Sequence, residues 1–142
     1  PIYAIIKKEG WLMEKPKFLS FRRPNGHNEF KEFMESLPIK DFQKLHAVIT
    51  SIEEFGLLTA IQQEWVKKLN SEIYEIRSKV STNIQRVLYF HESNNKYIIT
   101  HGFTKKTQKT PIREINHAIT IKREYEKEIQ NATRKYPNNI WQ

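Results

Sequence analysis

Three strand-like segments follow one another in the second half of the chain, and this run restricts the fold more than any other feature. Their expected bounds are Glu72–Lys79, Ile84–His91 and Tyr97–Phe103. The turns between them, Ser81-Thr82-Asn83 and Ser93-Asn94-Asn95, have the composition of hairpin loops. Since short turns join antiparallel neighbours, these segments predict an antiparallel sheet. The middle strand is apolar on both faces except at Gln85, Arg86 and His91, which indicates burial on both sides.

Amphipathic helices are predicted before and after this run of strands. Asn28–Leu37 and Lys40–Phe55 both repeat apolar residues at helical spacing. Pro38 leaves only a short connection between them, so they should form an antiparallel hairpin. The last helix should run from Pro111 to about Asn131, because Thr110 suits an N-cap and Pro111 the first helical position.

The remaining segments complete a single α+β domain with the order strand, two helices, three strands, helix. Lys17–Arg23 alternates as a strand does, and Leu57–Asn70 is interpreted as a connector. Residues 1–16 are expected to be an N-terminal extension or an extra strand, and residues 133–142 a loose tail. A chain of 142 residues has the usual length of one domain.

The charge of the chain favours an anionic partner. Lys and Arg number 24 against 16 Asp and Glu, so the formal net charge is +8. Nucleic acid, an acidic protein or a membrane surface would fit this charge. The chain has no cysteine and its five histidines lack metal-ligand spacing, so no disulfide, metal or other cofactor is expected. No apolar run reaches the length of a membrane span or a signal-peptide core, so a cytoplasmic protein is expected.

Positive charge converges on the last strands and on the loop that follows them. The cations are Arg77 and Arg86 in mid-strand and Lys105, Lys106 and Lys109 before the last helix. An arginine in an apolar strand is costly unless it meets an anion. Together these cations could form a concave face for RNA phosphates, with Tyr89 stacking on a base.

Each of these residues also has a purely structural interpretation. Arg77 could pair with Glu75, Arg86 could belong to a buried ion pair, and the lysines could form a solvated loop. His101, in the last strand, could act as an acid or base, or could turn into the core. If the backbone stays extended, Lys105 and Lys106 point to opposite sides, and we expect Lys106 to share the cleft with Arg86.

Three motifs resemble the phage-derived HigB branch of the RelE/ParE toxin superfamily. They are Ile73-Tyr74-Glu75-Ile76-Arg77, then Gln85-Arg86-Val87-Leu88-Tyr89-Phe90, then His101-Gly102-Phe103-Thr104-Lys105-Lys106-Thr107-Gln108-Lys109-Thr110-Pro111 with Glu114-Ile115. The last motif is the most specific, and the similarity covers about Lys17–Glu126. The resemblance implies a compact RelE-like fold, an antiparallel sheet packed by an N-terminal helical hairpin and a C-terminal helix.

The resemblance also implies the toxin of a type II toxin–antitoxin system. Such a toxin would be a metal-independent, ribosome-dependent endoribonuclease, in which the ribose 2′-hydroxyl attacks the adjacent phosphodiester and cations surround the phosphate. The implied partners are the ribosome, mRNA and an antitoxin encoded next to it, commonly a helix-turn-helix protein, with which it could form a heterotetramer. The alternative is a non-catalytic protein: a ParE-like inhibitor of DNA gyrase, or a binder of RNA or antitoxin.

The resemblance assigns roles to particular residues of this chain. The expected catalytic residues are Arg77, Arg86, His101 and Lys106, and the expected RNA-binding residues are Lys79, Tyr89, Lys105 and Lys109. Ile112 stands roughly where some relatives carry a catalytic tyrosine or histidine, so the identity of the general base stays open.

Overall fold

The strands predicted from the turn pattern form the centre of a five-stranded sheet with the order β1-β5-β4-β3-β2. The computed structural model describes residues 15–105 and 109–135. The strands are β1 (Lys17–Ser20), β2 (Val66–Lys68), β3 (Tyr74–Val80), β4 (Asn83–Ser93) and β5 (Lys96–Lys105). All neighbours are antiparallel except β1 and β5, which are parallel. The predicted α+β class is therefore confirmed.

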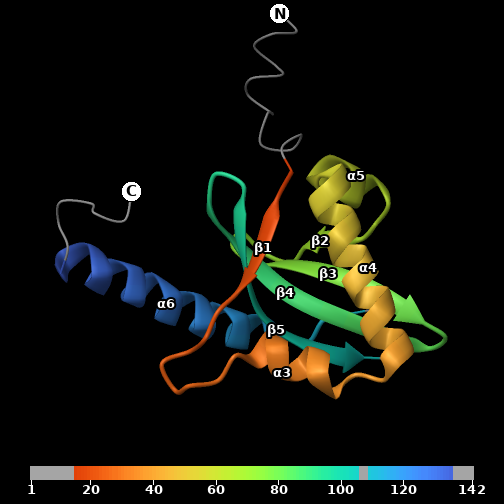
Figure 1. Ribbon diagram of the computed structural model, residues 1–142, viewed down its shortest axis with the longest axis horizontal. Helices are drawn as coiled ribbons and strands as arrows, with labels where there is room; N and C mark the ends of the chain where they lie inside the picture. The colour runs from red at the N-terminus through yellow and green to blue at the C-terminus, as the bar shows by residue number, and fades with distance from the viewer. Residues whose placement is uncertain (1–14, 106–108, 136–142) are drawn as a thin grey trace, which may run out of the picture.

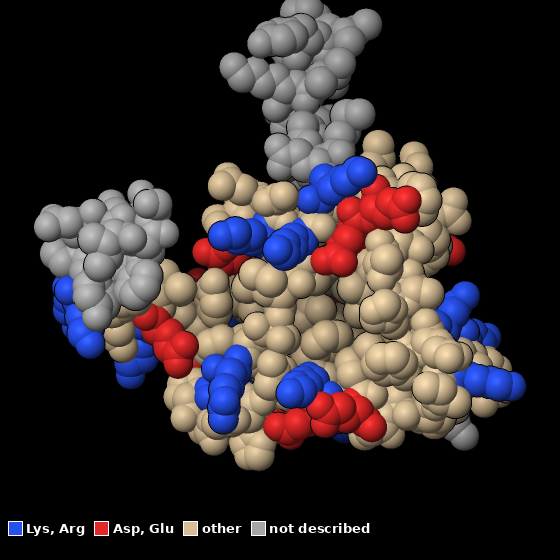
Figure 2. Space-filling model, in the orientation of Figure 1, with Lys and Arg blue, Asp and Glu red and all other residues tan. Residues whose placement is uncertain are grey.

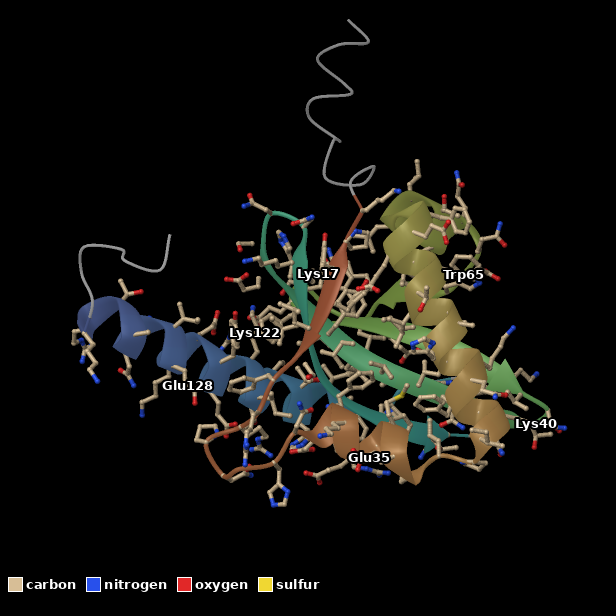
Figure 3. The ribbon with its side chains drawn as sticks, viewed as in Figure 1. Lys17, Glu35, Lys40, Trp65, Lys122 and Glu128 are labelled. Atoms are coloured by element: carbon tan, nitrogen blue, oxygen red, sulfur yellow. The ribbon has the colours of Figure 1, made fainter. Side chains whose placement is uncertain are left out.

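Helices cover both faces of this sheet (Figure 1). The two predicted N-terminal helices are α3 (Glu29–Ser36) and α4 (Ile39–Phe55), and with the short α5 (Leu57–Gln62) they pack on one face. The long α6 (Ile112–Lys135) packs on the other face. Its second half, where Glu128 lies, extends past the sheet (Figure 3). This arrangement is compatible with the RelE-like fold that the resemblance implies.

The apolar character of β4 follows from its central place between two cores. Val87 and Tyr89 point to the core under α4, whereas Leu88 and Phe90 point to the core under α6. Alternate residues of a strand face opposite sides, so both sets of side chains must be apolar. The prediction of a middle strand buried on both sides is confirmed.

The connector predicted for 57–70 is wrong, because this segment contains α5 and β2. A six-residue helix and a three-residue strand are too short to show a clear hydrophobic period. The last helix begins at Ile112, one residue later than predicted, and the Pro111 carbonyl oxygen accepts a hydrogen bond from the Glu114 N–H at 3.0 Å. Residues 1–14 and 136–142 lie outside the described part of the chain.

Gly102 explains one feature of the motif around it. It lies on the α4 side of β5 opposite Val87, and a Cβ at this position would overlap the ring of Phe33 in α3. Only glycine therefore lets α3 pack this closely on the sheet. The neighbouring residues His101 and Phe103 point to the opposite side, toward α6.

Candidate nucleic-acid interface

The strand register gathers the predicted cations on the face of the sheet that carries α6. Directly paired residues share a face, so each row of partners across β3, β4 and β5 lies on one side. The rows on the α6 face are Glu75–Leu88–His101, Arg77–Arg86–Phe103 and Lys79–Ile84–Lys105, and Lys67 of β2 lies opposite Glu75. The convergence of charge predicted from the sequence is thus present on one face.

The face seen in Figure 2 shows no comparable gathering of cations among the described residues. On the face seen in Figure 2, which carries α3 and α4, Lys and Arg side chains are interspersed with Asp and Glu. Charges of both signs in alternation suit a solvated surface rather than a phosphate-binding one. The α6 face is therefore the stronger candidate for binding an anion.

Arg86 is the buried centre of the cation rows, with none of its side chain exposed. Its Nη1 donates a hydrogen bond to the Thr110 hydroxyl at 2.8 Å and lies 3.9 Å from Oε2 of Glu75, which accepts a hydrogen bond from the same hydroxyl. Burial lowers the pKa of Arg86, although the Glu75 carboxylate opposes this shift. The interpretation of Arg86 as part of a buried ion pair is confirmed. The Thr110 hydroxyl lies between the Arg86 guanidinium and the Glu75 carboxylate. The sequence predicted Thr110 only as an N-cap and did not predict this position.

Arg77 shares the same carboxylate but reaches the solvent. Its Nε lies 3.2 Å from Oε1 of Glu75, and 25% of its side chain is exposed against 1% for Glu75. The predicted pair between Arg77 and Glu75 is therefore confirmed. Of the predicted catalytic residues that the structure describes, Arg77 is the one that a phosphate could touch directly.

Lysines surround this charged centre. Lys79 and Lys109 are exposed, and Lys105 is partly exposed on the same face as Arg86. A cavity of about 280 Å³ beside the start of α6 is lined by Lys67, Lys68, Leu69, Glu75, Lys109, Thr110 and Ile115. Lys67 was not predicted as part of the site, because its strand β2 was not recognised in the sequence. Glu75 was predicted only as a partner of Arg77.

The expected place of Lys105 on the opposite side from Arg86 is wrong. Arg86 pairs with Phe103, and Lys105, two residues further along β5, shares that face, whereas Thr104 pairs with Gln85 on the other. The sequence alone did not reveal which residue of β5 lies opposite Arg86. Lys106 lies outside the described residues.

Tyr89 does not lie beside Arg86, so its predicted stacking role at this face is wrong. It points to the α4 side, is 2% exposed, and packs edge-on against Phe18 with ring centroids 5.1 Å apart. Residues three apart on a strand face opposite sides, which separates Tyr89 from Arg86. Tyr89 is an aromatic residue of the core.

His101 is turned into the contact between β5 and α6, with 4% of its surface exposed. Its Nε2 lies 3.2 Å from Oε1 of Glu114, and its ring meets that of His117 edge-on with centroids 4.7 Å apart. Burial lowers the pKa of His101, the neighbouring His117 lowers it further, and Glu114 opposes both. Of the two interpretations of His101, the structure therefore shows the one in which it joins the core.

The His101 contacts continue into a polar network that ties α6 to α3. Nε2 of His117 lies 2.8 Å from Oε1 of Glu29, and Arg23 bridges Glu29 and Glu124, with 2.8 Å between its Nε and Oε1 of Glu124. The Glu124 and Glu29 carboxylates raise the pKa of Arg23, against the opposing effect of burial. The network holds α6 against the N-terminal part of the chain and so fixes the helix beside the cation rows.

Other kinds of site gain no support from the described residues. Across 15–105 and 109–135, no three His, Asp or Glu side chains are grouped so that they could hold a metal ion. Within the same ranges, no helix combines the length and the apolar character that crossing a bilayer requires.

Comparison with known protein families gives a match. The family model of phage-derived Gp49-like proteins (DUF891) matches residues 32–123, which include most of α3, all of α4 and α5, the whole sheet except β1, and the first half of α6. No curated protein matches the chain. The matched region contains Arg77, Arg86, Glu75 and Thr110, so the buried charged centre lies inside the family's shared part.

We expect Arg86→Met to lower the free energy of unfolding by about 3–5 kcal/mol, because the buried Glu75 carboxylate then loses its buried partner. The matched change Arg77→Met, at a partly exposed arginine on the same carboxylate, should cost about 1 kcal/mol or less. Urea denaturation monitored by circular dichroism measures the free energy of unfolding of both variants and of the parent. Equal midpoints for Arg86→Met and the parent would contradict the structural role.

We expect His101 to make the protein less stable as the pH falls below about 6.5. The folded-state pKa of His101 is lowered, so below the unfolded-state value of about 6.5 the unfolded chain binds the proton more readily. The contribution of neutral His101 to the free energy of unfolding is therefore complete above the unfolded-state pKa. It is lost as the pH falls through the folded-state pKa of His101. Denaturation of His101→Gln should show a shallower decline than the parent, and exposed His27→Gln serves as the control. Parallel curves for the parent and His101→Gln would exclude the effect.

Proposed function

Since the chain belongs to the Gp49-like family of phage-derived proteins, a family of RelE/HigB-like toxins, we propose that it is the toxin of a type II toxin–antitoxin pair that cleaves mRNA on the ribosome. The match to more than half of the chain supports the family. In this proposal the protein is a metal-independent endoribonuclease that arrests translation in the cytoplasm. The charges on the α6 face support the cleavage step.

The convergence of cations from several strands on one face carries this proposal. Arg77, Lys79 and Lys105 share the α6 face, and exposed Lys109 lies at the cavity beside the start of α6. Neighbouring phosphates of a single RNA strand need several positive charges along one groove. Guanidinium groups also stabilise the charge that develops on a phosphate during transfer.

The exposed and the buried charges take different roles in the proposed reaction. The ribose 2′-hydroxyl attacks the adjacent phosphorus and the 5′-oxygen leaves, so negative charge accumulates on the non-bridging oxygens. Arg77 would contact these oxygens, and Lys79, Lys105 and Lys109 would bind flanking phosphates. Arg86 would position Arg77 through their shared partner Glu75. His101 would fix α6 through Glu114.

The burial of Arg86 and His101 favours a second candidate function. Both were expected to act on the scissile phosphate, yet neither is more than 4% exposed. A toxin that only binds its target, as a ParE-like inhibitor of DNA gyrase does, needs no acid–base group. In this alternative the protein is still a toxin, but it does not cleave RNA.

We expect Arg77→Ala to slow single-turnover cleavage of ribosome-bound mRNA by about a hundredfold or more, since it removes a charge-assisted contact of the transition state. Lys109→Ala should mainly weaken binding and reduce the salt dependence by roughly one unit, because one phosphate contact is lost. Lys127→Ala is the matched control, an exposed lysine next to Glu128 on the part of α6 that extends past the sheet (Figure 3).

Mapping of cleavage sites on translated and on naked mRNA separates the two candidate functions. The nuclease proposal requires cuts in the translated message that disappear with Arg77→Ala. A folded parent protein that arrests growth and inhibits gyrase without cutting RNA would establish the second candidate instead.

We expect a small protein encoded next to this chain, of the helix-turn-helix type, to act as its antitoxin. The family implies such a partner, and the formal net charge of +8 suits a partner with an acidic binding segment. Co-expression should restore growth, and the two proteins should purify together, with the mass of the complex testing a heterotetramer. A neighbour that neither binds nor rescues would speak against the pairing.

A further inference from the structure

Within the part of the chain that the structure describes, β2 presents an open edge of the sheet. It is the last strand in the order, and its pairing with β3 fixes which of its backbone groups are used. The Arg77 N–H donates to the Trp65 oxygen at 2.9 Å, and the Leu69 N–H donates to the Ile73 oxygen at 2.9 Å. Because backbone groups alternate sides along an antiparallel strand, residues 65, 67 and 69 face β3. The N–H and C=O groups of Val66 and Lys68 therefore point to the open side.

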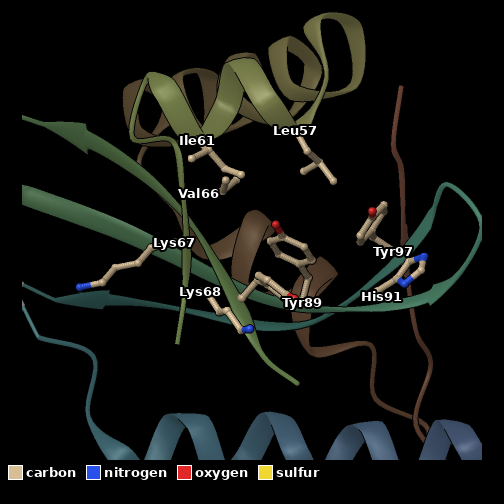
Figure 4. Close-up of a pocket in the computed structure, with 9 residues that line it drawn as sticks. Leu57, Ile61, Val66, Lys67, Lys68, Tyr89, His91 and Tyr97 are labelled. Carbon is tan, nitrogen blue, oxygen red and sulfur yellow. The ribbon is translucent and has the colours of Figure 1, made fainter. Parts of the chain in front are cut away.

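An apolar groove of about 730 Å³ begins at this edge and runs across the sheet under α5 (Figure 4). Leu57 and Ile61 of α5 form one wall, and Tyr89 and Tyr97 lie on the sheet side. Ile61 is 51% exposed although it is a large aliphatic residue. Val66 stands at the mouth of the groove, so a side chain placed beside it would meet Ile61. The groove thus offers the exposed side chain of Ile61 next to a strand edge that no described strand pairs with.

The positive charges of Lys67 and Lys68 determine which kind of strand can pair with the open edge of β2. Lys67 and Lys68 are exposed, and no ion pair joins either to a carboxylate of the described residues. Lys67 points to the α6 face and Lys68 to the groove face, so a neighbouring strand meets a positive charge on both sides. Opposite charges across a strand pair stabilise it and like charges destabilise it. A second copy pairing β2 with β2 would oppose lysine to lysine.

We propose that the β2 edge and its groove bind an extended acidic segment of a protein partner as a sixth strand. The segment hydrogen-bonds to the backbone of Val66 and Lys68, places an apolar side chain beside Val66 and Ile61, and sets two acidic side chains opposite Lys67 and Lys68. Backbone pairing supplies affinity, and the apolar and acidic side chains supply specificity. RNA fits this surface less well, since phosphates neither pair with a strand edge nor fill an apolar groove. The inference goes beyond RNA cleavage and does not depend on it.

Amide hydrogen exchange of the full chain tests this proposal residue by residue. The probe is a capped nine-residue peptide that carries valine followed by two glutamates at its centre, flanked by threonines. On binding, exchange at the Val66 and Lys68 amides should slow by at least about tenfold, because only these amides gain a partner. The amides of Lys67 and Leu69, which face β3, should change little.

Matched variants and peptides isolate each part of the site. Ile61→Asp should abolish binding, whereas Leu58→Asp, at another exposed residue of α5 outside the groove, should leave it intact. A peptide with lysines in place of the glutamates, and one with N-methyl groups on its pairing side, should not bind.

Several results would overturn the proposal. They are unchanged exchange at Val66 and Lys68, equal binding of the lysine peptide, equal protection by an RNA oligonucleotide, and peptide binding that appears only after residues 1–14 are deleted. Concentration-dependent protection without any peptide would likewise assign the edge to a second copy of the chain.

Discussion

The structure depends on one buried carboxylate, that of Glu75, held between two arginines. Arg86 approaches it from β4 and Arg77 from its own strand, while Thr110 brings the segment before α6 to the same point. In an interior with little water, a charge without its partner costs several kcal/mol, so all four groups must assemble together. This requirement ties β3, β4 and the beginning of α6 into one unit. The cations that remain accessible are arranged around it.

The two faces of the sheet serve different purposes because β4 separates them. Toward α4, aromatic rings and aliphatic side chains pack closely, and Gly102 leaves room for Phe33. Toward α6, the apolar core of Leu88 and Phe90 gives way to the charged rows as the strands approach Lys79 and Lys105. A polar face can be tolerated there because each buried charge has a partner. The same sheet therefore supports a rigid core and a basic surface.

The family and the geometry support a toxin by different routes. The Gp49-like match places the chain among phage-derived toxin-like proteins, and the geometry shows which charges could contact a partner. The division between buried Arg86 and partly exposed Arg77 matters most, since a phosphate can touch only the second. In an endoribonuclease, the buried arginine would keep the exposed one in place. In a toxin that only binds, the same pair would hold the sheet together.

Local signals in the sequence determined the central strands, the helical hairpin and the long last helix. Turn residues at 81–83 and 93–95 and apolar residues at helical spacing act over a few positions, so no knowledge of the fold was needed. The separation of Tyr89 from Arg86 was also contained in the sequence, because three positions along a strand reverse the face. The tertiary structure alone decided that Lys105 shares a face with Arg86, since this depends on the register between β4 and β5. The tertiary structure alone also decided the place of Thr110, because its hydroxyl hydrogen-bonds to the charged groups that the fold brings beside it. It likewise decided the existence of β2, because a three-residue strand forms only when it pairs with a neighbouring strand.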